Sequence, residues 1–247
     1  MFINSLKMFN FKEYFKLTSV YTFFSAFPAI LQIFVYPIIE GKNRLGASDF
    51  GHLEFIEVII SLCTIFIVLG AVIAVSRFYY DYNESEKDLN SLISSITSGI
   101  IIRFFILLGI TFLIAPLVGK LFHDPDLQQF HKYGPLLIVA ALTRSITGVA
   151  TMLFRNEKRV RNFIIVSFFY AVFRSGFQLI GVLYFDMSFL GFVYGTAIGG
   201  AIVSIGVIIY LYKRCGVKYK KDILKPVYSF SIPLVFNDLI FWGIVFI

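Results

Sequence analysis

The stretch LNSLISSITSGIIIRFFILLGITFLIAPLVG, residues 89–119, decides the fold, because its 31 residues include a single charged side chain, Arg103. A helix of about 20 apolar residues is long enough to cross the hydrocarbon core of a bilayer. The stretch is therefore predicted to span a membrane as one helix. A guanidinium inside such a helix is costly unless the protein provides a partner or a wet cavity.

The rest of the chain has the same character. Hydrophobic residues make up 58% of it and charged residues 15%, with a mean hydropathy of +0.81. Soluble domains contain roughly 25% charged residues. Joined across lone arginines, the uncharged runs form six segments of 19 to 31 residues. We expect an all-α, polytopic transmembrane helix bundle, with helices over 17–39, 52–76, 91–116, 134–154, 163–185 and 187–212 and the start of a seventh.

Basic residues are distributed unevenly between the loops. The N-terminal segment and alternate loops after it carry fifteen Lys and Arg, whereas the other loops carry four. Loops rich in Lys and Arg remain in the cytoplasm. We therefore expect a multi-pass protein of the cell (inner, cytoplasmic) membrane with a cytoplasmic N-terminus. This distribution explains the formal net charge of +7 without nucleic acid as a partner.

The chain is expected to contain four parts. Segment 1–16, with three lysines among apolar residues, is typical of an amphipathic lead-in at the membrane surface. A six-helix transmembrane lobe (17–212), a basic cytoplasmic linker (213–226) and the start of helix seven (227–247) follow.

A short pattern recurs at the two ends of the chain. KEYFK (12–16) precedes FSAFP (24–28), and KDILK (221–225) precedes FSIP (230–233). Transporters are commonly built from such repeated halves. Either two helix starts are similar by chance, or helix seven begins a second half and the chain is part of a longer protein.

Two further arginines lie near the middle of apolar segments. Arg144 is the twelfth residue of the run 133–154, and Arg174 is the thirteenth of the run 162–185. Each costs roughly 2.5–3.5 kcal/mol at such a depth if it has no compensation. We expect Arg144, Arg174 and Arg103 to face a cavity. The alternative is that they pair with backbone carbonyls between helices.

Polar neighbours favour the cavity, because they recur at helical spacing on the same faces. Tyr170 and Gln178 share a face with Arg174, and Gln32 belongs to a polar stripe on the first helix. Asp238 on helix seven is a candidate counter-charge. Gly191, Gly195 and Gly199 form G-x-x-x-G-x-x-x-G, which favours close helix packing.

No catalytic motif or metal-ligand cluster occurs in the sequence, so an enzyme, a resident cofactor and a metal site are not expected. Cys63 lies inside an apolar run and Cys215 lies in a lysine-rich loop, and neither belongs to a C-x-x-C motif or a Cys/His cluster.

Several stretches resemble a known family. NRLGASDFGHLEFIEVI (43–59), SRFYYDYNESEKDLNSLISS (76–95), FRNEKRVRNFIIVSFFYAVFRSGFQLIGVLY (154–184) and YSFSIPLVFNDL (228–239) are similar to Wzx-like polysaccharide flippases. These belong to the multidrug/oligosaccharidyl-lipid/polysaccharide exporter superfamily. The resemblance implies one lobe of a MATE-like fold of twelve to fourteen helices, with Arg144, Arg174 and Arg103 in a cationic cavity.

The resemblance also implies a function and partners. It implies alternating-access flipping of an undecaprenyl-pyrophosphate-linked oligosaccharide for surface polysaccharides such as lipopolysaccharide O-antigen. The implied partners are that substrate, membrane lipids and polysaccharide polymerase or assembly proteins, and H⁺ or Na⁺ could be a coupling ion. The alternatives are a multidrug/cation antiporter of the same fold, which would want acidic cavity residues, and a non-transporting scaffold of a polysaccharide assembly complex.

Overall fold

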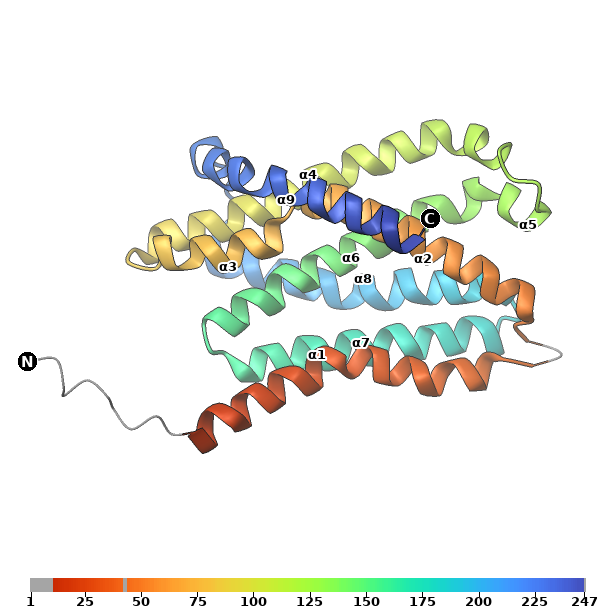
Figure 1. The fold of residues 1–247 in the computed structure, drawn as a ribbon, viewed down its shortest axis with the longest axis horizontal. Coiled ribbons are helices and arrows are strands. Elements are labelled where there is room, and N and C mark those ends of the chain that lie inside the picture. The colour runs from red at the N-terminus through yellow and green to blue at the C-terminus, as the bar shows by residue number, and fades with distance from the viewer. Residues whose placement is uncertain (1–10, 42–43, 247) are drawn as a thin grey trace, which may run out of the picture.

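The structure of the protein is a computed structural model that describes residues 11–41 and 44–246 (Figure 1). The described residues form helices joined by short connections. In chain order they are α1 (Phe11–Ile39), α2 (Ala47–Val68), α3 (Ala71–Tyr82), α4 (Glu86–Gly119), α5 (Pro125–Gln128), α6 (Phe130–Asn156), α7 (Val160–Leu183), α8 (Ser188–Cys215) and α9 (Lys221–Phe246).

Seven segments of the described chain are helical, long and apolar enough to cross a membrane, and α2 and α3 together form one of them. The predicted all-α transmembrane bundle is confirmed. Residues 1–10 of the predicted lead-in lie outside the described residues, and the remainder already belongs to α1. The seventh helix begins at Lys221 rather than 227, and α8 extends to Cys215, so that only residues 216–220 connect the two.

The helix predicted over 52–76 is broken, and this expectation is corrected. α2 ends at Val68, and Leu69 and Gly70 adopt left-handed backbone conformations with φ of 45° and 68°. A Cβ at Gly70 would lie 3.1 Å from Cβ of Ser231 on α9. The close approach of α9 therefore requires a residue without a side chain at this break.

Local signals set several of the helix ends. Ser85 caps α4 by accepting a hydrogen bond from the backbone N–H of Asp88, and Glu86 and Asp88 place negative charge in the first turn. At the other end of the chain, α8 terminates before Gly216, whose φ is 71°. A glycine at this position is a common helix stop.

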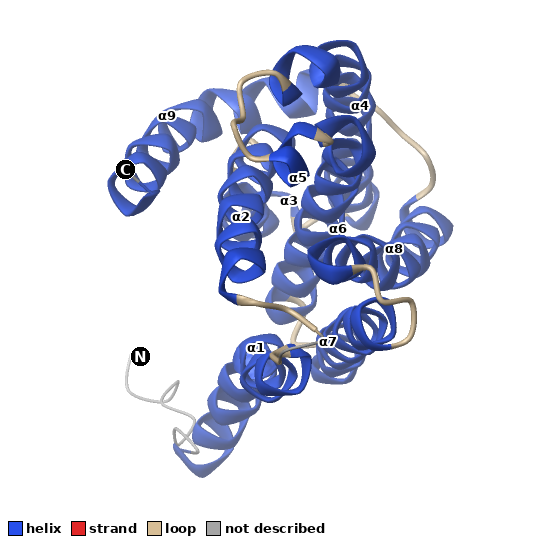
Figure 2. Ribbon diagram, turned by 90° about the vertical axis from the view of Figure 1, so that its right-hand side faces the viewer, coloured by secondary structure: helices blue, strands red, loops and turns tan. Residues whose placement is uncertain are grey.

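α6 is the most buried of the seven spans and α1 is the least buried. α6 packs against α2, α3, α4, α7 and α8, whereas α1 packs mainly against α7. An end-on view shows α1 and α9 at the two extremes of the side that carries α2 (Figure 2). The centre of the fold is thus α6, and the outer helix α1 covers only part of the lobe.

α7 and α8 form the most extensive helix pair. Gly191 lies against the backbone of Gly181, Gly195 against that of Gln178, and Gly199 against that of Phe173. Small residues at this spacing let two helices approach until their backbones touch. The three predicted packing glycines lie along this contact.

Candidate functional site

A cavity of about 460 Å³ lies between α1, α2, α6 and α7. It exists because α1 packs mainly on α7 while α2 packs on α6, which leaves space between the two pairs. Its polar lining residues are Ser25, Gln32, Tyr36, Glu54, Glu57, Arg144 and Arg174.

Arg144 is paired inside this cavity. Its Nη2 lies 2.6 Å from Oε1 of Glu57, and its Nη1 donates to Oγ of Ser61 at 3.4 Å. The side chains of Arg144 and Glu57 are 32% and 39% exposed, so the pair is accessible from the cavity. The counter-charge of Arg144 is therefore Glu57.

Arg174 has neither an ion pair nor a hydrogen-bond acceptor among the described residues, and its Nε is buried. Gln32 lines the same cavity and donates to Oε1 of Gln178 at 2.9 Å and to Oγ of Ser175 at 3.3 Å. The Oε1 atom of Gln32 is buried without a partner. The guanidinium of Arg174 thus lines the cavity without a partner among the described residues, whereas the unpaired Oε1 atom of Gln32 is buried behind the cavity wall.

Two further hollows continue along α1 and share residues with this cavity. One, of about 270 Å³, is lined by Arg144, Tyr170 and Thr147 among others, and shares Ser25 with both neighbours. The next, of about 600 Å³, is lined by Ser25 and Arg155. Arg155 donates to Oγ of Ser25 at 3.0 Å. Three arginines therefore follow the same face of α1.

The cavity and the two hollows beside it form one polar track along α1. The charge of this track differs from the expectation of a cationic cavity. Its linings contain Arg144, Arg155 and Arg174, but also Glu54 and Glu57. The lining is of mixed sign with one excess positive charge, and Arg174 is the arginine with no partner among the described residues. Glu54 and Glu57 lie about one turn apart on α2, and both line the cavity.

Two predicted cavity residues lie elsewhere. Gln178 is fully buried between helices, where it accepts from Gln32 and donates to Oγ1 of Thr196 at 2.8 Å. Asp238 lies on α9, which packs against α2, α3 and α4, and it is not among the lining residues of the track. The expectation that Asp238 pairs with an arginine of the cavity is therefore wrong.

Arg103 is also placed outside the cavity, at the break between α2 and α3. Its Nε donates to the carbonyl of Ile67 at 2.7 Å and its Nη2 to that of Val68 at 3.4 Å. Its Nη1 donates to the hydroxyl of Tyr228 on α9 at 2.6 Å. The last carbonyls of a helix have no intrahelical partner and carry partial negative charge. Arg103 satisfies these carbonyls, as the alternative of carbonyl pairing foresaw.

Sequence reasoning missed three residues of the track. In the sequence, Glu54 and Glu57 lie near the start of an apolar run, where charges are typical of the membrane interface, and Arg155 lies among the basic residues of a loop. Helical spacing contained the signal, because Arg155 continues the face of Arg144 by steps of three and four residues. Glu57 and Ser61 are likewise one turn apart.

The fold and the site define a class: a multi-pass helical membrane protein with a charged cavity in a MATE-type lobe. The crystal structure of MATE in complex with Br-NRF superposes with a TM-score of 0.67 at 15% identity, covering 91% of this chain and 53% of that one. The MATE P26A mutant gives 0.59 at 16%, covering 90% and 50%. This chain spans about half the length of these structures.

Sequence comparison gives the family. The model of the polysaccharide biosynthesis protein family matches residues 44–245, and the chain belongs to that family. No curated protein matches the sequence.

Proposed function

We propose that this protein contributes to a transporter that flips a lipid-linked oligosaccharide, carried on a pyrophosphate, across the cytoplasmic membrane for surface polysaccharide synthesis. The observation that carries the proposal is the unpaired guanidinium of Arg174 in a cavity where Arg144 is already paired. Membership of a polysaccharide biosynthesis family and a MATE-type fold support it.

The chemistry of arginine suits a pyrophosphate. A guanidinium donates two parallel hydrogen bonds to phosphate oxygens and stays charged in a site of low dielectric. Arg174 offers such donors without first breaking an ion pair. Arg144 and Arg155, further along α1, provide successive positions for an anionic headgroup.

The Arg144–Glu57 pair makes headgroup binding at Arg144 a competition between two anions. A phosphate that binds Arg144 competes with Glu57 for the same guanidinium. The basic loops support a cytoplasmic N-terminus in the inner membrane, and polymerase or assembly proteins would take the exported glycan.

A second candidate function is a cation antiporter, favoured by Glu54 and Glu57 in the cavity. The two functions require opposite residues. A flippase depends on Arg174, whereas an antiporter depends on the carboxylates and exports organic cations in exchange for protons.

The test is export of surface glycan in the native host by a variant with Arg144→Ala and Arg174→Ala. We expect export to be lost while the amount of membrane-inserted protein stays unchanged. Arg161→Ala, which removes an exposed arginine near the start of α7, is the matched control and should export normally. Normal export by the double variant would overturn the proposal, and loss of proton-driven dye efflux in Glu57→Gln alone would favour the antiporter.

A further inference from the structure

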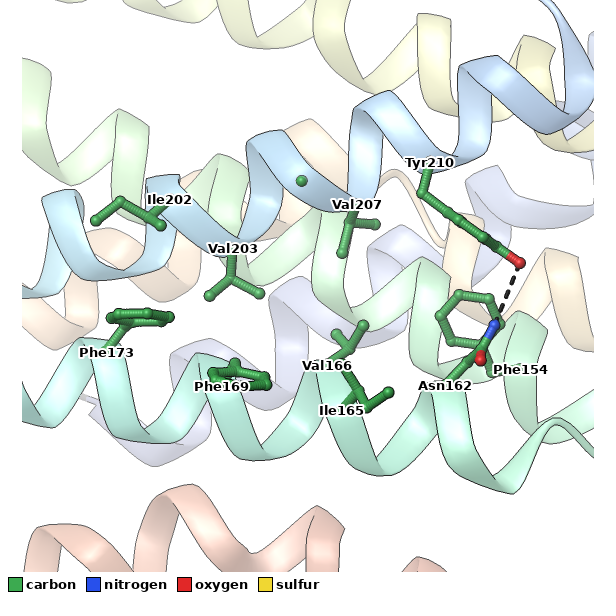
Figure 3. Close-up of a pocket in the computed structure, with 11 residues that line it drawn as sticks. Phe154, Asn162, Ile165, Val166, Phe169, Phe173, Ile202, Val203, Val207 and Tyr210 are labelled. Carbon is green, nitrogen blue, oxygen red and sulfur yellow. Dashed lines mark hydrogen bonds between the residues drawn. The ribbon is translucent and has the colours of Figure 1, made fainter.

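A separate hollow lies on the other side of α7, between α7 and α8 (Figure 3). It has a volume of about 390 Å³ and an almost entirely apolar lining. Its α7 residues run from Asn162 to Phe173, which is about 16 Å at the rise of an α-helix. The hydrocarbon core is about 30 Å thick, so the groove extends through about one leaflet.

The groove is open along its outer edge and has free space at Gly206. Ile165, Phe169 and Ile202 are 41%, 44% and 44% exposed. A Cβ built on Gly206, which lines the groove, would meet nothing within 4 Å. An acyl chain can therefore enter from the side and lie against Phe169 and Phe173, whose rings stack with centroids 5.8 Å apart.

One end of the groove is polar, and its donors converge there. Tyr210 accepts hydrogen bonds from Nη1 of Arg159 at 3.1 Å and from Nδ2 of Asn162 at 3.2 Å. Figure 3 shows the Asn162–Tyr210 bond at this end. With both bonds directed onto its oxygen, the hydroxyl proton of Tyr210 has no acceptor in the part of the chain that the structure describes. The hydroxyl can therefore donate to an external acceptor such as a phosphate oxygen.

The charge of this end is positive. Glu157, only 6% exposed, is shared by Arg159 at 3.0 Å and Arg214 at 2.6 Å, so that two cations face one anion. The side chain of Arg159 is 45% exposed. α7 also begins at Val160, and its first N–H groups point toward the same end.

We propose that this groove binds one anionic membrane phospholipid, with an acyl chain along α7 and α8 and the phosphate at Tyr210, Arg159 and Asn162. The inference is independent of the proposed transport, because α7 separates the groove from Arg174. The leaflet-length apolar groove and its cationic end together match the two parts of such a lipid.

The test uses fluorescence quenching by lipids with brominated acyl chains. Phe169→Trp in a Trp242→Phe background places a reporter in the groove. The protein is reconstituted in vesicles of digalactosyldiacylglycerol, which has no phosphate. We expect brominated phosphatidylglycerol to bind at the reporter about tenfold more tightly than brominated digalactosyldiacylglycerol, the ratio that one hydrogen bond to a charged group provides. The parent protein, which reports from Trp242, should show a ratio near one.

Two variants, each added to the reporter protein, have matched controls. Tyr210→Phe should abolish the preference, whereas Tyr184→Phe, at the exposed far end of α7, should keep it. Gly206→Phe should fill the groove and lower quenching by both lipids, whereas Gly109→Phe on an open face of α4 should not. Native mass spectrometry repeats the Tyr210 comparison without the Phe169→Trp reporter. It compares the lipid retained by the protein that keeps Trp242 with the lipid retained by its Tyr210→Phe variant.

Equal quenching by the two brominated lipids at the groove reporter, or an unchanged preference in Tyr210→Phe, would overturn the proposal. A competition experiment provides a further test, in which an unlabelled lipid displaces the brominated lipid and relieves the quenching. If undecaprenyl phosphate relieved the quenching more strongly than unlabelled phosphatidylglycerol at the same mole fraction, the groove would belong to a carrier lipid and the proposal would be overturned.

Discussion

Arg144 of α6 and Glu57 of α2 form an ion pair with Nη2 and Oε1 2.6 Å apart. Arg174 in the same cavity has no such partner among the described residues. Two arginines at similar predicted depth therefore differ in what an arriving anion must do. It binds Arg174 directly, but it must displace a carboxylate to bind Arg144.

Glu57→Gln should strengthen anion binding, because it removes the negative charge that competes for Arg144. We expect several-fold tighter binding of a lipid pyrophosphate to the purified protein. Stability should change by less than about 1 kcal/mol, since both partners are partly exposed and partly exposed ion pairs contribute little. Glu84→Gln, in an exposed turn outside the cavity, is the control. Unchanged or weaker binding by Glu57→Gln would contradict the assignment.

Arg103→Met should destabilise the protein, because the carbonyls of Ile67 and Val68 lose their donor and Tyr228 loses its partner. The expected loss is about 2–4 kcal/mol in the free energy of unfolding. The measurement is a denaturant titration in mild detergent. Arg77→Met, which breaks an exposed pair with Asp81, should stay within about 0.5 kcal/mol. Equal losses in the two variants would show that the break does not depend on Arg103.

Gly195→Ala should separate α7 from α8, because the new Cβ would collide with the backbone of Gln178. A forced methyl group in a packed contact costs about 1–3 kcal/mol. Gly206→Ala on the same helix meets nothing within 4 Å and should be neutral. The measurement is the melting temperature of each variant, which should fall for Gly195→Ala only. Similar melting temperatures would show that the α7–α8 contact accommodates the added methyl group.

The loop before α6 should give the lobe a pH-dependent contribution to stability. A hydrogen bond from His52, 3.0 Å away, lowers the pKa of the Asp124 carboxyl, and the backbone N–H of Asp126 adds to the effect. A lowered pKa stabilises the folded state above the ordinary Asp value of roughly 3.9, and this stabilisation is lost as the pH falls through the lowered pKa.

Asp124→Asn tests this contribution, because the amide keeps the cap of α5 but loses the charge. It should lower the melting temperature at neutral pH and have little effect at a pH below the folded-state pKa. A difference of the same size at both pH values would exclude ionisation of Asp124 as the cause.

The seven spans could be predicted because the length of an uncharged run directly reports membrane-spanning capacity. The pairing of the arginines could not, since it depends on which helices meet. Arg103 and Arg144 look alike in the sequence, yet α4 carries the first to the carbonyls of a broken helix and α6 carries the second to Glu57. The break itself depends on α9, because Gly70 faces Ser231 from the opposite end of the chain.

The most direct measurement of the central claim is the rate at which purified protein in vesicles moves a fluorescent oligosaccharide-pyrophosphoryl lipid between leaflets. Arg174→Ala should slow this rate at least tenfold, the effect expected from losing a charge-assisted contact to the phosphate, while Arg161→Ala should leave it unchanged. The same rate in Arg174→Ala and the parent protein would contradict the assignment of Arg174 as the anion-binding residue of the cavity.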